Sequence, residues 1–571
     1  KSVKRNSVDR TVTPVIALKQ SEIRDNYTAM TLAFNGNWAL EFRAYDNGAA
    51  YRFITSSKNE LTILDEAAEF VLPADATAYM SYAKSHVTMY EEPYTIRKME
   101  DMTLADNHTY LPILFSTDNW RMMISESDLY DYPAMFLKSN KQNTLNTAMP
   151  KAISEYIVDG HKQFPSGYEK HIAKTAGTRT FPWRVVTLTK DDASMILSHL
   201  NYLLNREPAA GSDWSWVKPG KVAWDWWSDF DNGKGCTTKT YVRFIDFAAK
   251  NGVEYVIFDE GWSAKLNIWK FSPKVDVPYL IDYANKKGVG IILWMAWAQV
   301  YGEEEKVAEH FSKLGAKGFK VDFMDRGDAE IANFLEKFAA ACAKHRMLID
   351  YHGSYRPVGL QRTYPNVLTF EGIHGLEQMK WGKKGKDMCY NDVACFFIRM
   401  TAGPMDYTPG AMDNYKIGDY RGNGTNPGSV GTRCHQMALM ALYESPLQML
   451  SDSPTKYEKN MECFAFMAKT PVVWDVTIGL GGCPESFATA ARKARDGSWY
   501  AAGITNKEAR DFAFKTCFLG DGEWKAEIFR DADDAGENPT KYIHETKTVK
   551  AGEEMSFHMA PGGGFIIKFS K

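Results

Sequence analysis

Three carboxylates lie close together after a short apolar run in the middle of the chain. Asp322, Asp325 and Asp328 follow Gly318-Phe319-Lys320-Val321, which has the length and composition of a buried strand. A strand that ends in several charges must release them into a cleft, because a buried and unpaired carboxylate is costly. In a parallel barrel, that end of the strands is where catalytic groups gather. We therefore predict that Asp322 is a catalytic carboxylate.

Acidic residues close five of the six predicted strands in this region, and indole rings close the other. The strand ends carry Asp225; Asp259 and Glu260; Trp294 and Trp297; Asp322; Asp350 and His352; and Glu371, with Glu377 six positions later. A single acid at a strand end is commonly a helix N-cap or part of a surface ion pair, but five at one rim favour a shared site. A pair of carboxylic acids with aromatic neighbours is what cleavage of a glycosidic bond needs. One carboxylic acid protonates the leaving oxygen, and a second carboxylate attacks the sugar or activates water.

These acids are carried by a repeating pattern of apolar strands and helices. Strands are predicted at residues 221–227, 253–259, 289–297, 318–323, 347–351 and 367–370. Near-continuous apolar runs of this kind indicate a parallel sheet that is covered on both faces. With two less clear units between about 395 and 455, the pattern predicts a (β/α)8 TIM barrel over residues 206–472. A doubly wound sheet is the alternative, but it usually has a Gly-rich turn after its first strand, and none is found here.

The segments on either side of the barrel are predicted to be all-β, so the fold class is α/β plus all-β. Residues 38–45 and 50–54 flank the turn at Asp46-Asn47-Gly48 and predict a hairpin. This hairpin belongs to an N-terminal β-sandwich domain of residues 1–205, in which residues 191–204 are predicted to be a helix. Short strands at 498–504, 511–518, 524–530 and 565–569 predict a small C-terminal β-domain of residues 473–571.

Composition argues against several classes of protein. The 68 basic and 71 acidic residues give a net charge of −3, which does not favour nucleic acid or a charged membrane surface as a partner. We find no uncharged apolar run long enough to span a membrane, although a signal peptide could have been removed before residue 1. The eight cysteines form no C-x-x-C pair, which argues against a zinc ribbon. Aromatic residues reach 13%, which fits either large cores or stacking against sugar rings.

An ordered set of motifs resembles glycoside hydrolase family 97. The motifs are K-P-G-K-V-A-W-D-W-W, D-E-G-W, F-K-V-D-F-M-D-R, Y-H-G-S and F-E-G-I-H-G-L-E-Q-M-K-W, and they are most similar to the retaining α-galactosidase branch of that family. The resemblance implies an N-terminal β-super-sandwich, a (β/α)8 barrel and a C-terminal β-sandwich domain. It also implies an exo-acting enzyme that removes terminal α-D-galactosyl residues by double displacement. Extra strands usually precede the segment that begins at Lys1, so we expect the chain to start inside the N-terminal domain.

The resemblance implies roles for two acids. Asp322 matches the nucleophile of the retaining branch, and Glu377 matches the general acid/base. Inverting members carry a glutamate base directly after the histidine that corresponds to His352, and this chain has Gly353 there. Since a glycine cannot activate water, retention of configuration is expected. Asp325 could be mistaken for the nucleophile, but the K-x-D spacing from Lys320 favours Asp322.

The resemblance also implies a calcium site and contacts to the substrate. The expected Ca²⁺ ligands are Glu371, Glu377 and, from the N-terminal domain, Glu91 in preference to Glu92, all of which offer the oxygen donors that calcium prefers. The expected substrate-binding residues are Trp224, Asp225, Asp259, Glu260, Trp294, Lys320 and His352, with Trp226 as a further stacking candidate. The expected location, by family habit, is periplasmic or extracellular.

Several alternatives stay open at this point. A β-L-arabinopyranosidase, or an enzyme of dual specificity, is close because that sugar matches galactose apart from the C5 hydroxymethyl group. An inverting α-glucosidase and a catalytically inactive carbohydrate-binding protein are less favoured, because Asp322 and Glu377 are both present and a base at position 353 is not. The expected partner is an oligosaccharide or glycoside, and the oligomeric state is left open.

Overall fold

The central part of the chain folds into a nearly closed parallel barrel. The computed structural model describes residues 2–103, 108–141, 143–229, 231, 235–381 and 387–571. Seven strands pair in the order β25-β24-β23-β22-β19-β18-β28, and every neighbouring pair is parallel. They are β18 (Gly220–Trp224), β19 (Tyr255–Phe258), β22 (Gly290–Ala296), β23 (Gly318–Asp322), β24 (Leu348–Tyr351), β25 (Val367–Phe370) and β28 (Leu447–Leu450). The six predicted barrel strands are therefore confirmed.

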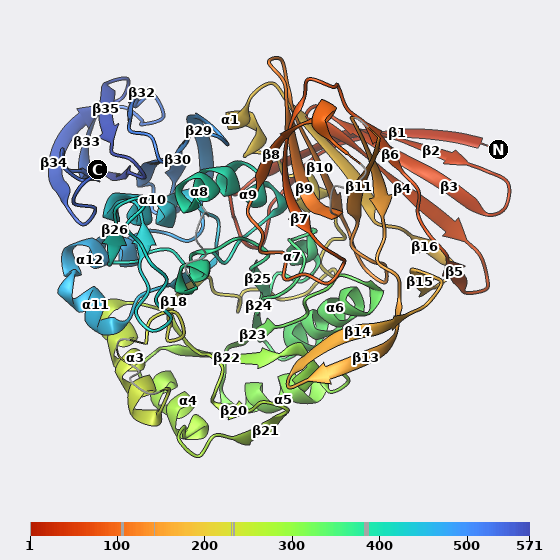
Figure 1. Cartoon of the computed structure of the whole chain (residues 1–571), viewed down its shortest axis with the longest axis horizontal. Coiled ribbons are helices and arrows are strands. Elements are labelled where there is room, and N and C mark those ends of the chain that lie inside the picture. The colour runs from red at the N-terminus through yellow and green to blue at the C-terminus, as the bar shows by residue number, and fades with distance from the viewer. Residues whose placement is uncertain (1, 104–107, 142, 230, 232–234, 382–386) are drawn as a thin grey trace.

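Helices between the strands cover the outside of the barrel (Figure 1). They include α3 (Thr238–Asn251), α4 (Val277–Lys286), α5 (Glu304–Leu314) and α6 (Ala329–Lys344). Helix α3 shows why these segments are helical. The Thr237 side chain accepts a hydrogen bond from the amide of Thr240 at the N-terminus, and Gly252 ends the helix with a φ of 70°. Tyr241, Phe244 and Ala248 recur at helical spacing and are buried against the barrel core.

An irregular segment closes the barrel where an eighth strand was expected. Of the two further units expected between residues 395 and 455, only β28 supplies a strand to the described sheet. The segment between β25 and β28 bonds to both sides. The amide of Asp406 donates to the carbonyl oxygen of Phe370 (2.8 Å), and the amide of Met405 donates to the carbonyl oxygen of Glu444 (2.8 Å). Pro404 and Pro409 lack an amide hydrogen, so this segment cannot form a complete ladder.

The N-terminal part is a large antiparallel sheet of 13 strands. The predicted hairpin is confirmed as β3 (Trp38–Tyr45) paired with β4 (Gly48–Ser56). The helix predicted at residues 191–204 is instead two short helices, α1 (Asp192–Met195) and α2 (Leu200–Leu203). Between them, the carbonyl of Ser198 accepts a hydrogen bond from Nζ of Lys19, which comes from another part of the chain (3.1 Å).

One hairpin of the N-terminal part leaves the large sheet and reaches the barrel. Strands β13 (Ile153–Asp159) and β14 (Lys162–Tyr168) pair only with each other among the described strands. In Figure 1 they extend from the N-terminal strands to the region of α5 and α6. The hydrogen bond from the Tyr156 hydroxyl to Glu330 in α6 places the hairpin against the barrel.

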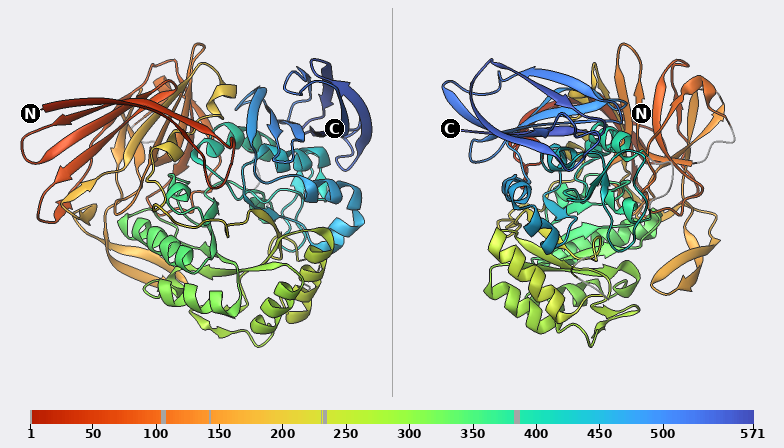
Figure 2. Two further views of the ribbon diagram at one scale, coloured as in Figure 1. Left: turned by 180° about the vertical axis from the view of Figure 1, so that it is seen from behind. Right: turned by 60° about the vertical axis from the view of Figure 1, so that its left-hand side comes forward.

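The C-terminal part has a six-stranded antiparallel sheet, in the order β29-β30-β31-β36-β33-β34, and a separate two-stranded sheet of β32 and β35. Four of these strands were not predicted individually, namely β29 (Val476–Cys483), β30 (Phe487–Lys493), β34 (Tyr542–Lys550) and β35 (Glu554–Met559). The predicted strands correspond to β31 (Trp499–Thr505), β32 (Arg510–Lys515), β33 (Glu523–Asp531) and β36 (Gly564–Ser570). Both all-β parts lie along the same side of the barrel (Figure 2). None of the described helices has the length and apolar character of a membrane-spanning segment.

A buried cluster of charges joins the three parts. Glu444, which precedes β28, lies 3.8 Å from Nζ of Lys19 in the N-terminal part and 3.6 Å from Nη2 of Arg492 in the C-terminal part. All three side chains are at most 4% exposed. The relative positions of the parts are therefore fixed by a charged contact as well as by the apolar core.

Candidate active site

A cavity of about 480 Å³ opens at the carboxyl ends of β19, β22, β23, β24 and β25. This volume lies within the usual range for sites that bind small molecules. The cavity is lined by Met89, Glu91, Lys162, Trp226, Asp259, Glu260, Trp294, Lys320, Asp322, Phe323, His352, Glu371, Glu377, Gln378 and Trp381. The structure thus brings together both predicted catalytic acids, the three predicted calcium ligands and five of the seven predicted substrate-binding residues.

Asp322 ends β23, and both of its carboxylate oxygens accept hydrogen bonds. The Trp294 indole Nε1 donates to Oδ2 (3.1 Å), and the backbone amide of Phe323 donates to Oδ1 (2.6 Å). Burial raises the pKa of Asp322, and the charges of His352 and Lys320 oppose that rise. The carboxylate is therefore fixed in orientation beside two cationic groups.

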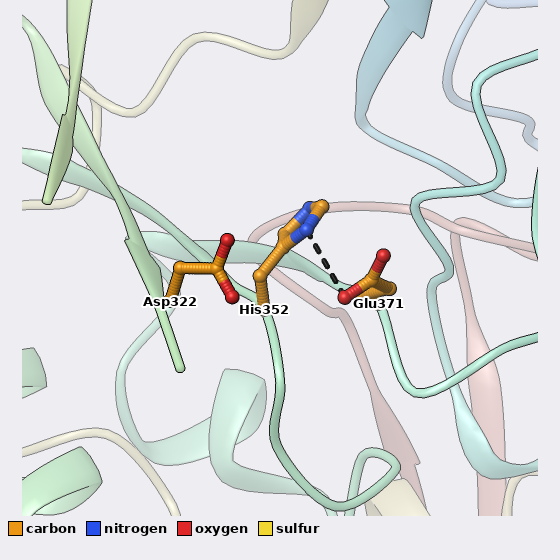
Figure 3. Close-up of side chains that lie close together, drawn as sticks. All are labelled: Asp322, His352 and Glu371. Carbon is orange, nitrogen blue, oxygen red and sulfur yellow. Dashed lines mark ion pairs between the residues drawn. The ribbon is translucent and has the colours of Figure 1, made fainter. Parts of the chain in front are cut away.

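His352 lies among three carboxylates and next to Asp322. Its Nδ1 is 3.1 Å from Glu371 Oε2, as drawn in Figure 3, and its Nε2 is 2.7 Å from Asp406 and 3.1 Å from Asp350. Burial acts to lower the pKa of His352, but the charge of Glu371 and the contacts to Asp350 outweigh burial and hold that pKa well above its ordinary value. Carboxylates beside both ring nitrogens favour the imidazolium form, which would place positive charge close to Asp322.

Asp259 is held by two donors in the wall of the cavity. Nζ of Lys320 lies 3.0 Å from Asp259 Oδ2, and the Trp224 indole donates to the same oxygen (2.7 Å). Asp225 accepts a hydrogen bond from the backbone amide of Asp259 (3.2 Å). Trp224 and Asp225 are each 1% exposed and are not among the described lining residues, so the structure places them behind Asp259 rather than at the cavity surface.

Three carboxylates, Glu91, Glu371 and Glu377, line the cavity, and their charges shift one another's pKa values. Burial and the charge of Glu371 raise the pKa of Glu377 to about 8. Burial, Glu371 and Glu377 raise the pKa of Glu91 well above its ordinary value. Burial also acts to raise the pKa of Glu371, but the charge and hydrogen bond of His352 outweigh it and leave that pKa below its usual range. The mutual repulsion of these acids is what a bound cation would relieve.

The donor set therefore suits a hard cation such as Ca²⁺, because it consists of carboxylate oxygens. Glu91 lines the cavity and accepts a hydrogen bond from Gln378 Nε2 (2.6 Å), whereas Glu92 is exposed and lies outside the described lining. Among the described residues, the compact groups with donor atoms within 4.8 Å of one another are Asp322-His352-Glu371 and Asp350-His352-Asp406. The predicted ligand set is not one of them, and calcium remains a prediction.

Trp226, which was predicted as a stacking candidate, lines the cavity, whereas Trp381 and Lys162 in the same lining were not predicted. The Trp226 and Trp381 rings lie 5.8 Å apart, and Trp381 is 52% exposed. Lys162 comes from the β13–β14 hairpin, and the Asp159-Gly160 pair between two strand-like runs was a hairpin signal that could have been used. No local pattern in the sequence tells where such a hairpin lies in the fold.

Family models match all three parts of the chain. Residues 216–373 match the model described as glycoside hydrolase 97, residues 1–208 match its N-terminal domain, and residues 473–570 match its C-terminal, oligomerisation domain. The predicted family and fold are thereby confirmed.

Individual relatives agree with the family models. A retaining alpha-galactosidase of Bacteroides thetaiotaomicron is 40% identical over 588 residues, which cover 99% of this chain and 88% of the relative. A probable retaining alpha-galactosidase of Streptomyces bingchenggensis is 28% identical, with 94% and 79% covered. A family 97 enzyme of Pseudoalteromonas sp. strain K8, solved with panose, has a TM-score of 0.88 at 25% identity, with 100% and 91% covered. A beta-arabinopyranosidase has the same fold, with a TM-score of 0.84 at 21% identity and 99% and 91% covered. The chain therefore belongs to glycoside hydrolase family 97.

Proposed function

We propose that the protein is a retaining, exo-acting α-galactosidase. The observation that carries this proposal is the pair of acids in one cavity with different electrostatic surroundings. Asp322 is oriented by two hydrogen-bond donors and lies near two cationic groups, whereas burial and Glu371 raise the pKa of Glu377 to about 8. An ionised nucleophile and a protonated acid are what double displacement requires. The 40% identity to a retaining alpha-galactosidase supports galactose as the sugar.

The two acids would act in sequence. In the first step, an oxygen of Asp322 forms a bond to the anomeric carbon, the bond from that carbon to the leaving oxygen breaks, and Glu377 gives its proton to the leaving oxygen. In the second step, Glu377 takes a proton from water, and the water oxygen replaces Asp322 at the anomeric carbon. Two inversions return the α configuration. Positioned proton transfer of this kind contributes about 10²–10⁴-fold to the rate.

The depth of the cavity supports removal of a terminal sugar. Asp259 and Lys320 are each 3% exposed and would bind the hydroxyl groups of the terminal residue, with Glu260 nearer the opening. His352 also lines the cavity, and with both ring nitrogens engaged by carboxylates it would contribute positive charge and ring surface to that wall. Trp381, at 52% exposed, lies at the mouth, through which the leaving group would extend. Trp226 and Trp381 offer that group a surface for stacking.

A metal ion would be held by Glu91, Glu371 and Glu377, and we propose Ca²⁺. When bound, it would supply positive charge that stabilises charge developing on a sugar oxygen. The residues themselves position the site, because Gln378 orients Glu91 and the amide of Gly353 donates to Glu371 (3.2 Å). By family resemblance we also propose a periplasmic or extracellular location, which assays of separated cell fractions would test.

The test is hydrolysis of 4-nitrophenyl α-D-galactopyranoside, with the first-formed anomer followed by NMR. We expect the α-anomer of galactose to appear first, and the corresponding β-L-arabinopyranoside to be a poorer substrate. Asp322→Gly should abolish turnover, and azide should restore slow cleavage with β-galactosyl azide as product. A first-formed β-anomer, a preference for the arabinopyranoside, or an Asp322→Gly protein with the wild-type rate would each refute the proposed function.

A further inference from the structure

We propose that His161, at the tip of the β13–β14 hairpin, is a positioning residue for the nucleophile Asp322. The inference rests on the proposed function, since it concerns the orientation of Asp322 during attack. The imidazole ring comes from the N-terminal part of the chain and not from the barrel that carries the catalytic acids.

His161 contacts both residues that orient Asp322. Its ring stacks on Phe323, with centroids 4.6 Å apart and an interplanar angle of 12°, and meets Trp294 edge-on at 5.8 Å. Phe323 supplies the amide, and Trp294 supplies the indole, that donate to the two oxygens of Asp322. One imidazole therefore packs against both donors of the nucleophile. His161 is only 8% exposed, so the contact is a packed one.

The contact matters because the loop after β23 is held in a disfavoured conformation. Phe323 and Asp325 have φ values of 64° and 52°, a left-handed conformation that is disfavoured for residues other than glycine. Such a conformation persists only where the surroundings fix it. Lys162, next to His161, places its ammonium 4.1 Å from the centroid of the Phe323 ring and 3.7 Å from Asp325. The hairpin tip thus contacts both strained residues.

The hairpin itself is anchored on the barrel. The tip is a two-residue loop, since Asp159 pairs with Lys162, and Gly160 takes the positive φ of 59° that such a loop needs. A lone two-stranded hairpin is marginally stable in water. Here the Tyr156 hydroxyl donates to Glu330, and the guanidinium of Arg326 lies 5.0 Å from the centroid of the Tyr156 ring.

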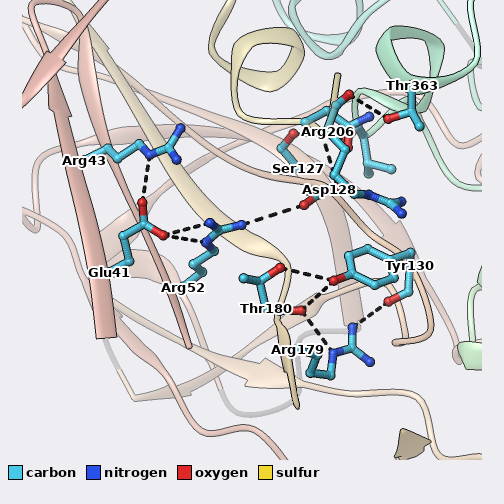
Figure 4. Close-up of polar contacts among 12 residues, drawn as sticks. Glu41, Arg43, Arg52, Ser127, Asp128, Tyr130, Arg179, Thr180, Arg206 and Thr363 are labelled. Carbon is cyan, nitrogen blue, oxygen red and sulfur yellow. Dashed lines mark hydrogen bonds and ion pairs between the residues drawn. The ribbon is translucent and has the colours of Figure 1, made fainter. Parts of the chain in front are cut away.

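The sheet from which the hairpin extends is also fixed to the barrel, by the polar contacts of Figure 4. Arg206 donates to the buried Asp128 (2.8 Å) and to Glu336 of α6 (2.8 Å), and its carbonyl accepts from the Thr363 hydroxyl (2.7 Å). Arg52 of β4 lies 3.9 Å from the same Asp128. Contacts to the barrel therefore hold both the hairpin itself, at Tyr156, and the sheet from which it extends, through Arg206. With the hairpin fixed in this way, His161 can hold the loop after β23 in place.

A double-mutant experiment tests this role. His161→Ala should lower kcat/KM for 4-nitrophenyl α-galactoside by about 10- to 100-fold, because a small misplacement of a reacting group has an effect of this size. His161→Phe, which keeps a flat ring, should recover most of the activity. In an Asp322→Gly background, adding His161→Ala should leave the azide-restored rate unchanged, because the oriented carboxylate is no longer there. Val158→Ala, at a 61% exposed position on the same hairpin, is the matched control and should retain full activity.

Two outcomes would overturn the inference. One is an unchanged kcat/KM in His161→Ala. The other is an equal loss in both backgrounds, which would assign His161 to substrate binding or to stability. Formation of β-galactosyl azide by Asp322→Gly checks the proposed function separately, so failure of one proposal is distinguishable from failure of the other.

Discussion

Replacing Gly353 tests whether the retaining site depends on the absence of a side chain at this position. Gly353 follows His352 and has a φ of 54°, in the left-handed region. A Cβ atom there would lie 2.8 Å from Asp325 Oδ1, 2.9 Å from the backbone nitrogen of Phe323 and 3.2 Å from Asp322 Oδ1. The 2.9 Å distance to the backbone nitrogen of Phe323 is decisive, because a backbone atom cannot rotate away as a side chain would.

Two effects therefore add in Gly353→Ala. The left-handed backbone should cost about 1–2 kcal/mol of unfolding free energy. The overlap should displace the loop that carries Phe323, whose amide donates to Asp322, and kcat should fall about 10- to 100-fold. The assays are steady-state kinetics on the nitrophenyl galactoside and denaturant unfolding of the same preparation. Gly353→Glu should also lose activity rather than change to inversion, because its Cβ meets the same atoms.

Gly252→Ala is the matched control. Gly252 ends α3 with a φ of 70°, and no atom lies within 4 Å of the position that its Cβ would occupy. This variant should show a similar loss of stability with kcat unchanged. A Gly353→Ala enzyme with wild-type kcat, or a Gly353→Glu enzyme that releases the inverted product at a useful rate, would refute the reasoning.

Three further predictions follow from buried charges. Glu444→Ala should lower the unfolding free energy by about 3–5 kcal/mol, because Lys19 and Arg492 stay buried without their carboxylate, and a loss below about 1 kcal/mol in denaturant unfolding would contradict this. Burial raises the pKa of Asp531 from 3.8 to about 6, so between these pH values the folded state binds a proton that the unfolded state does not. The contribution of Asp531 to the unfolding free energy is therefore present below pH 3.8 and is lost as the pH rises to about 6. The stability of Asp531→Asn should lack that fall, and equal pH slopes for both proteins would count against it. Chelation by EDTA should lower the midpoint of thermal unfolding, and added Ca²⁺ should restore it, because a ligand that binds only the folded state stabilises that state. Glu91→Gln should abolish both changes. A wild-type midpoint that responds to neither EDTA nor Ca²⁺ would exclude the site.

The sequence was informative where burial produces a regular pattern. The barrel strands were predictable because residues such as 290–296 and 348–351 are apolar throughout or nearly so, as strands covered on both faces must be. The acids at their ends could be grouped for the same reason, since parallel strands place their carboxyl ends at one rim. Their roles, and the domain boundaries after residues 205 and 472, remain predictions.

The misses share a tertiary cause. The helix expected at 191–204 is interrupted where Lys19, far away in sequence, bonds the Ser198 carbonyl. Trp224 was expected at the cavity surface, but its indole supports Asp259 from behind. His161 carried no chemical motif, and its importance arises only from the fold that brings it to Phe323.

The irregular stretch around residues 404–409 has a consequence for how the enzyme would fail under stress. This stretch, here called the seam, has fewer backbone hydrogen bonds to its neighbours than a complete strand would have. The barrel should therefore open first at the seam, before the amides of the other strands lose their protection from hydrogen exchange. Asp406 lies in this seam and bonds His352, so even a local opening there would release the imidazole that faces Asp322. Inactivation should therefore precede loss of the circular dichroism signal as denaturant is added.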